Sequence, residues 1–140
     1  MTPKLLLRIA AAIMLIHNIP HTLGHSKWKS APDEVNRRAI DAMTSNQFEF
    51  MGRTTSYAQF YDGYGYGGTL TLLLAMVILW ILSGNQSALS KQLAMVTGIF
   101  LVLWAVMEYI YFFPLAAGFT IVAAILAIIA SAKSPREHIN

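Results

Sequence analysis

The 140-residue sequence contains no cysteine and few charged residues. Without cysteine the chain cannot form a disulfide, a thiolate metal site, an iron–sulfur cluster or a cysteine nucleophile. Charged residues make up only 12% of the sequence and hydrophobic residues 56%, whereas a typical soluble domain is about 25% charged. So few charged residues cannot cover the surface of a water-soluble protein. The composition therefore argues against a soluble enzyme and predicts an integral membrane protein.

Basic residues slightly outnumber acidic ones, with 10 Lys and Arg against 7 Asp and Glu, and the formal net charge is +3. Basic residues that flank membrane spans explain this excess better than a phosphate-binding stripe does. We therefore expect the lipid bilayer to be a partner, and we expect no binding of nucleic acid.

Four apolar stretches are long enough to cross a bilayer, which requires roughly 20 helical residues. They cover about residues 4–25, 60–83, 91–113 and 114–132 of a single integral membrane domain, residues 1–140. A short cluster of helix-breaking residues separates the second stretch from the third, and Pro114 begins the fourth. These short connections predict an all-α fold, an antiparallel four-helix transmembrane bundle.

The largest polar segment is the loop between the first and second spans, residues 26–59. Ser30, followed three residues later by Asp33, is typical of a helix start, and Val35 and Met43 then lie on one helical face. This pattern predicts a short amphipathic helix that lies on the membrane surface. The alternative is a polar connector that becomes ordered only against the bundle.

An even number of spans places both termini on the same side of the membrane. Five Lys and Arg residues lie on the terminal side and five in the long loop, so the positive-inside rule gives a tie. Because the loop also carries acidic residues and is small enough to be translocated, we expect cytoplasmic termini.

Three histidines form a stripe at the end of the first span. His17, His21 and His25 follow one another at intervals of four residues, which places them on one helical face. Three interpretations are open: a structural or interfacial role, proton transfer or substrate binding, and a metal or haem site. The glutamate of the helical metalloprotease motif is missing, and we expect neither a metal nor another cofactor.

Glu108 lies in the third span, where a charged side chain at the centre of the membrane costs roughly 2.5–3.5 kcal/mol. We expect it to face protein and to pair with a histidine of the first span, unless it reaches headgroup water by itself. Counting residues along the helices places His17, Glu108 and Asp62 towards the same pole of the bundle.

Aromatic rings are frequent around the same pole. Most of them are expected to form an interfacial belt, and some are candidates to line a pocket for a flat apolar ligand. The candidate catalytic residues are His17, His21 and Glu108. The candidate binding residues are His25, Asn18, Asp62, Tyr61, Trp104 and Tyr109.

Small residues on two spans predict close helix packing. Gly63 and Gly67 lie one turn apart at the start of the second span, and Ala116, Thr120 and Ala124 share a face of the fourth.

Two short motifs of the chain resemble those of a known family. They are HNIPHTLGH at residues 17–25 and SYAQFYDGYG at residues 56–65. Together with the four spans and the polar loop, these motifs resemble small bacterial integral membrane proteins near the DoxX-like group. The resemblance implies a compact four-helix bundle in the bacterial inner membrane. It also implies a quinone or redox partner, because some DoxX-like proteins are associated with quinone-linked oxidoreductases.

Two functions are compatible with these residues. One is an accessory or structural subunit whose polar pole contacts a membrane-protein partner or a second copy of the chain. The alternative is a membrane enzyme or binding protein for a lipophilic small molecule, quinone-like or sterol-like. In that case His17 or His21 exchanges a proton with Glu108.

Overall fold

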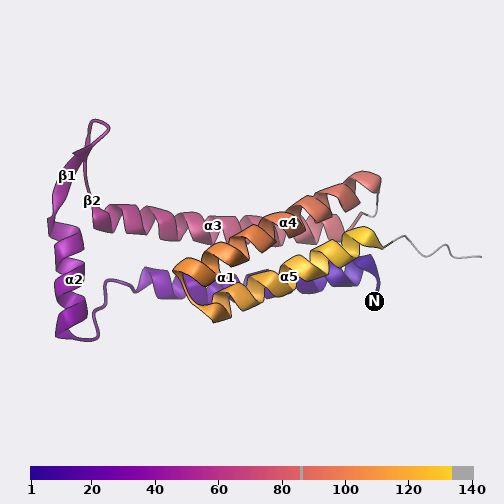
Figure 1. Ribbon diagram of the computed structural model, residues 1–140, viewed down its shortest axis with the longest axis horizontal. Helices are drawn as coiled ribbons and strands as arrows, with labels where there is room; N and C mark the ends of the chain where they lie inside the picture. Colours follow the sequence, from indigo (N-terminus) through magenta and orange to yellow (C-terminus); the bar gives the residue numbers. More distant parts are fainter. Residues whose placement is uncertain (86, 134–140) are drawn as a thin grey trace, which may run out of the picture. The chain divides into compact units, whose positions relative to one another are not determined.

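A computed structural model describes residues 1–85 and 87–133 of the chain. Its elements are α1 (Pro3–Ser26), α2 (Glu34–Ser45), β1 (Gln47–Phe50), β2 (Arg53–Ser56), α3 (Tyr57–Ser83), α4 (Ala88–Tyr111) and α5 (Pro114–Ala132) (Figure 1). Helices α1, α3, α4 and α5 are each long and apolar enough to cross a membrane. They indicate a multi-pass membrane protein.

The four long helices occupy the predicted spans, with ends shifted by a few residues. Helix α3 begins at Tyr57 instead of residue 60, and α4 ends at Tyr111 instead of residue 113. Pro114 lies in the first turn of α5, as predicted, where its missing N–H leaves no helical hydrogen bond unmade. At the start of α4, the Ser87 hydroxyl accepts a hydrogen bond from the Ser90 backbone N–H at 3.2 Å.

The helix in the polar loop begins later than predicted. Asp33, and not Ser30, caps α2, because its carboxylate accepts a hydrogen bond from the Asn36 backbone N–H at 2.8 Å. The predicted helix start at Ser30 was wrong, since Pro32 disfavours helical backbone at the residue before it. No residue of α2 is buried.

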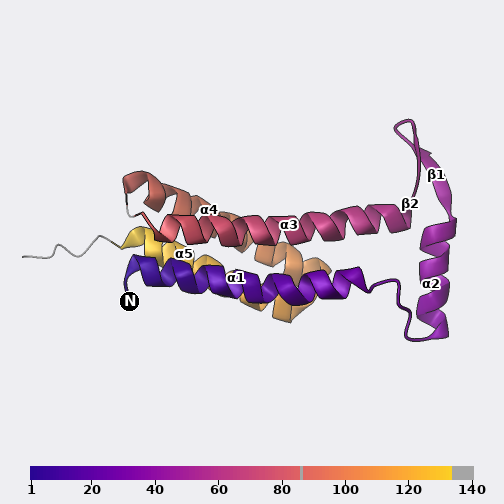
Figure 2. The ribbon, with the colours of Figure 1, turned by 180° about the vertical axis from the view of Figure 1, so that it is seen from behind.

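A β-hairpin follows α2 and leads into α3 (Figure 2). Strands β1 and β2 are antiparallel, with Phe50 opposite Arg53 at the turn. The two linking residues, Met51 and Gly52, have φ angles of 50° and 81°. Positive φ at both positions is typical of the two-residue turns whose twist matches that of a hairpin. The all-α prediction was therefore incomplete, because it left this hairpin in an irregular loop.

The contacts divide the chain into two compact units. Unit 1 comprises Met1–Asn18 and the chain from Leu72 onward, and unit 2 comprises Ile19–Thr71. Unit 1 therefore holds the first part of α1, the end of α3, and all of α4 and α5. Unit 2 holds the rest of α1, then α2, the hairpin and the start of α3.

The apolar core belongs to unit 1 and draws side chains from all four long helices. Its buried members are Leu6, Leu7, Ala10, Ala11, Met14, Leu72, Ala75, Leu79, Leu82, Ala94, Leu101, Ala123, Ala124, Ala127 and Ala130. Helices α4 and α5 lie side by side (Figure 1). The predicted small-residue face of α5, with Ala116, Thr120 and Ala124, is buried.

Candidate functional site

Two polar clusters contain most of the candidate site residues, one in each unit. Cluster 1, in unit 1, consists of His17, Trp104, Glu108 and Thr120. Cluster 2, in unit 2, consists of His25, Trp28, Lys29 and Asp62. Each cluster combines a histidine, a carboxylate and an indole.

His17 connects cluster 1 across three helices. Its Nε2 lies 3.5 Å from Oε1 of Glu108 on α4, and its Nδ1 lies 3.1 Å from the Thr120 hydroxyl on α5. The imidazole also stacks on Phe119, with ring centroids 5.9 Å apart. The side chain is only 6% exposed. Both ring nitrogens of this α1 residue are therefore close to polar groups of other helices.

Glu108 supplies the carboxyl group of cluster 1, and its side chain is also 6% exposed. Trp104, one turn earlier on α4, donates its indole N–H to Oε1 at 2.9 Å. The second oxygen, Oε2, is buried and has no hydrogen-bond partner among the described residues. Because a buried unpaired carboxylate is strongly unfavourable, either His17 is protonated or both groups are neutral. The two states contain the same number of protons, so the pair can hold one proton on either side.

Asp62 is the centre of cluster 2 and lies near the start of α3. It accepts a hydrogen bond from the Trp28 indole at 2.6 Å and another from the Lys29 ammonium at 2.7 Å. His25 Nε2 lies 3.9 Å from the same carboxylate, is buried, and has no hydrogen-bond partner among the residues that the structure describes. Lys29 therefore supplies a positive charge to this carboxylate.

The His25 ring packs closely against α3. It meets Tyr66 edge to face, with ring centroids 4.9 Å apart. A Cβ atom at Gly65 would overlap the imidazole, so glycine at this position leaves the space that the His25 ring occupies. The predicted close approach at Gly63 and Gly67 was wrong, because no described atom lies within 4 Å of a Cβ at either position. The close contact is made at Gly65, which faces the His25 side chain, whereas the prediction considered only the packing of one helix backbone on another.

The remaining candidate residues lie in different environments. His21 Nε2 donates to a backbone carbonyl of α3 at 3.2 Å. Asn18 is buried in unit 1. Tyr61 packs beside His25, with ring centroids 5.5 Å apart. Tyr109 is 67% exposed on α4, and none of the contacts found among the described residues joins it to cluster 1.

The structure therefore pairs the ionisable candidates as two sets, one in each unit. His17 is paired with Glu108, and His25 with Asp62. In the described part of the chain, no three or more His, Asp or Glu residues are grouped as metal binding requires. The sequence did not identify Lys29 or Thr120 as site residues. For Thr120 a signal was available, since it is a hydroxyl on a mostly apolar span.

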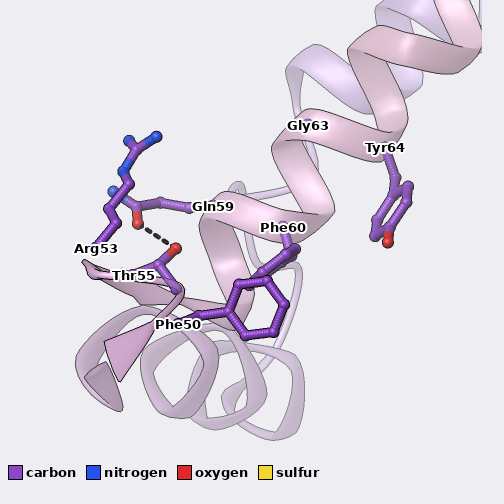
Figure 3. Close-up of a pocket in the computed structure, with 7 residues that line it drawn as sticks. All are labelled: Phe50, Arg53, Thr55, Gln59, Phe60, Gly63 and Tyr64. Carbon is purple, nitrogen blue, oxygen red and sulfur yellow. Dashed lines mark hydrogen bonds between the residues drawn. The ribbon is translucent and has the colours of Figure 1, made fainter. Parts of the chain in front are cut away.

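A groove lies between the hairpin and the start of α3, entirely within unit 2 (Figure 3). Its volume is about 490 Å³, and its lining consists of Phe50, Arg53, Thr55, Gln59, Phe60, Gly63 and Tyr64. The sequence did not predict this groove because one of its sides is the hairpin.

No protein-family model matches this chain, and no curated protein or solved structure shows significant similarity to it. Its function is therefore inferred from the clusters, the groove and the membrane-spanning helices.

Proposed function

We propose that this protein is a small accessory or structural subunit of a membrane, built as an antiparallel four-helix bundle. The connections between the long helices support the bundle. Only Phe112 and Phe113 separate α4 from α5, and residues 84–87 separate α3 from α4. Connections this short join neighbouring helices that run in opposite directions.

The observation that carries a structural role is the mutual pairing of the polar groups in cluster 1. His17 contacts Glu108 and Thr120, so side chains of α1, α4 and α5 are joined at one buried point. In a bilayer, a polar contact between helices contributes on average about 0.6 kcal/mol and at most about 1.7 kcal/mol. Cluster 1 stabilises one arrangement of these helices, and such an arrangement is what a structural subunit needs.

The accessory role is assigned to α2, which contains 12 residues and buries none of them. An isolated helix of this length is marginal in water and depends on packing for its stability. Val35 is 70% exposed, and it shares a helical face with Ala39 and Ala42. We assign this face to a membrane-protein partner or to a second copy of the chain.

A photoreactive amino acid introduced at Val35 tests this role. In native membranes we expect a discrete protein adduct from position 35, and little adduct from position 37, because Arg37 lies on the opposite face of α2. Mass analysis of the adduct distinguishes a second copy from another membrane protein. If position 35 labels only lipid, α2 is a surface helix and the accessory role is wrong.

A second candidate function is proton exchange with a lipophilic, quinone-like or sterol-like molecule. It is favoured by Glu108 Oε2, which is buried beside His17 without a hydrogen-bond partner among the described residues. A carbonyl or hydroxyl group of a ligand would supply that partner. The His17–Glu108 pair would then give a proton to the ligand or take one from it.

Trp104 is a natural reporter for this second function, because its indole donates to Glu108. In a variant with Trp28→Phe and Trp80→Phe, a quinone analogue is expected to quench Trp104 fluorescence with a saturable dependence on concentration. Glu108→Gln is expected to weaken that binding. Unsaturable quenching that is equal in both proteins would exclude the proton-exchange candidate and leave the structural role unaffected.

The proposed location is the bacterial inner membrane, with both termini in the cytoplasm. The resemblance of residues 17–25 and 56–65 to DoxX-like proteins supports the location, and the acidic residues in the loop support the orientation. Fusions of a phosphatase and of a fluorescent protein to the C-terminus test the orientation. We expect an inactive phosphatase and a fluorescent fusion, and the reverse result would invert the topology.

A further inference from the structure

The groove in unit 2 lies at the end of a helix that is longer than a bilayer core. Helix α3 contains 27 residues, which span about 40 Å at about 1.5 Å per residue. The hydrocarbon core is only about 30 Å thick. The most apolar part of α3 begins near Leu70. Its first two turns, with Gln59 and Phe60, therefore extend into the headgroup region.

Gln59 and Arg53 are among the hydrogen-bond donors that line this groove (Figure 3). Gln59 Oε1 accepts from the Thr55 hydroxyl at 2.8 Å and from the Ser56 backbone N–H at 3.2 Å. A backbone N–H only donates, so these bonds fix which end of the amide is oxygen and leave its NH₂ group as a donor. Within the described part of the chain, Arg53 forms no ion pair. The Arg53 guanidinium and the Gln59 amide are thus a cation and a neutral donor that an anion in the groove can bind.

Three other lining residues, Phe50, Phe60 and Tyr64, are aromatic. Phe50 and Phe60 pack edge to face with ring centroids 5.4 Å apart, and Tyr64 stacks along Phe60 at 6.5 Å. Phe50 is 50% exposed, and Met51 at the hairpin tip is 92% exposed. A ligand that matches this surface combines an oxyanion with an apolar part.

We propose that the groove binds the headgroup of an anionic phospholipid. The Arg53 guanidinium and the Gln59 amide bind the phosphate, because the planar fork of arginine gives two parallel hydrogen bonds to phosphate oxygens. The glycerol and the first carbons of the acyl chains lie against Phe50, Phe60 and Tyr64. A zwitterionic lipid is a poorer ligand, because its own cation competes with Arg53 for the phosphate.

Native mass spectrometry of the full-length protein in detergent tests this site directly, with phosphatidylglycerol and phosphatidylcholine as probes. We expect phosphatidylglycerol to bind at lower concentration, and Arg53→Gln to weaken its binding by about tenfold. Arg38→Gln is the matched control, because it removes the same charge from an exposed position outside the groove. Its effect is expected to stay below about twofold.

Two further variants keep the test decisive. Arg53→Lys retains the positive charge at the hairpin turn but not the planar guanidinium, so we expect an intermediate loss of affinity for phosphatidylglycerol. This expectation holds even if Arg53→Gln disturbs the hairpin. Phe50→Ala is expected to weaken binding of phosphatidylglycerol but not of inorganic phosphate, which separates lipid from free anion. Equal affinity for the two lipids, equal losses in Arg53→Gln and Arg38→Gln, or phosphate binding as tight as lipid binding would each overturn the proposal.

Discussion

Clusters 1 and 2 contain the same three chemical groups, but they balance charge in different ways. In cluster 1, Glu108 and His17 are both 6% exposed, and no Lys or Arg among the described residues pairs with the carboxyl group. In cluster 2 the Asp62 side chain is 29% exposed, and Lys29 binds it at 2.7 Å. Among the described residues, the basic group beside the carboxyl group of cluster 1 is therefore a histidine, whereas in cluster 2 a lysine supplies the positive charge.

This difference shows that a histidine beside a carboxylate has no fixed role. Where a lysine is present and water can enter, the loss of one partner is largely compensated by solvent. Where both groups are buried, the loss of one leaves the other without its partner in a low dielectric. The predictions below test this contrast, beginning with the largest expected effect.

Glu108→Gln is expected to have the largest effect. The substitution keeps the size of the side chain but removes the acid that faces His17, and it should destabilise the detergent-solubilised protein by on the order of 1–3 kcal/mol. Equilibrium unfolding followed by circular dichroism measures this loss. The same method applied to His17→Ala and to the double variant completes a double-mutant cycle.

The cycle decides whether cluster 1 acts as a unit. If it does, His17→Ala adds little to the effect of Glu108→Gln, because the interaction has already been lost. Additive effects within about 0.5 kcal/mol would show that the two groups are not coupled. The proton-exchange candidate would then have to be abandoned.

Gly65→Ala is expected to have the next largest effect, and it probes the packing of cluster 2 apart from its charges. A Cβ atom at this position would overlap the His25 ring, so the free energy of unfolding should fall by about 1–2 kcal/mol. Gly63→Ala on the same helix is the control, since no described atom lies within 4 Å of the added carbon. The control should be neutral or stabilising by about 0.5–1 kcal/mol. Equal effects of the two variants would contradict the close packing of His25 on α3.

Asp62→Asn should have a smaller effect than Glu108→Gln. The Asp62–Lys29 pair is partly exposed, and such pairs contribute about 0.2–1 kcal/mol. Added salt should reduce this contribution, because it screens exposed charges more than buried ones. Unfolding curves of both variants at low and high salt measure the contrast. A loss at Asp62 that is as large as that at Glu108 and does not depend on salt would remove the distinction between the clusters.

The long helices could be predicted from the sequence because their signal is local. Runs of about 20 apolar residues define α1, α3, α4 and α5, and Pro114 marks one boundary directly. The hairpin gave a weaker signal. Gln47 to Phe50 alternates polar and aromatic residues, but the turn is Met51-Gly52 and not one of the Asn-Gly or Asp-Gly pairs that usually identify such turns.

The candidate site could be predicted only in part, because residue type and helix spacing do not determine the partners. The spacing placed His17, His21 and His25 on one face, and a buried partner was expected for Glu108. The partners are determined by tertiary contacts. Asp62 lies close to His25, and it accepts hydrogen bonds from Trp28 and Lys29 in the loop. The groove depends on the hairpin, so the sequence contained no separate signal for it.

The smallest expected effect concerns Asp33, a fully exposed carboxylate that lies outside the membrane-spanning helices. The backbone N–H and the side-chain amide of Asn36 both donate to it, and these hydrogen bonds lower the pKa of Asp33 below its usual value. Because the folded pKa is the lower one, the cap stabilises α2 fully above the pKa of the unfolded chain. This stabilisation is lost as the pH falls through the folded pKa.

The chemical shift of the Asn36 amide, followed by NMR during an acid titration, measures the cap directly. We expect its midpoint to lie below that of a solvated aspartate, and α2 to fray at its first turn in the same range. Asp33→Asn is the matched control, since asparagine also caps helices but does not titrate there. The titration should disappear in this variant while the helix persists. An unchanged titration in Asp33→Asn would assign the proton to another group. In that case the hydrogen bonds from Asn36 would not be what lowers the pKa of an exposed carboxylate in this loop, and the contrast between partly exposed Asp62 and buried Glu108 would lose its support from Asp33.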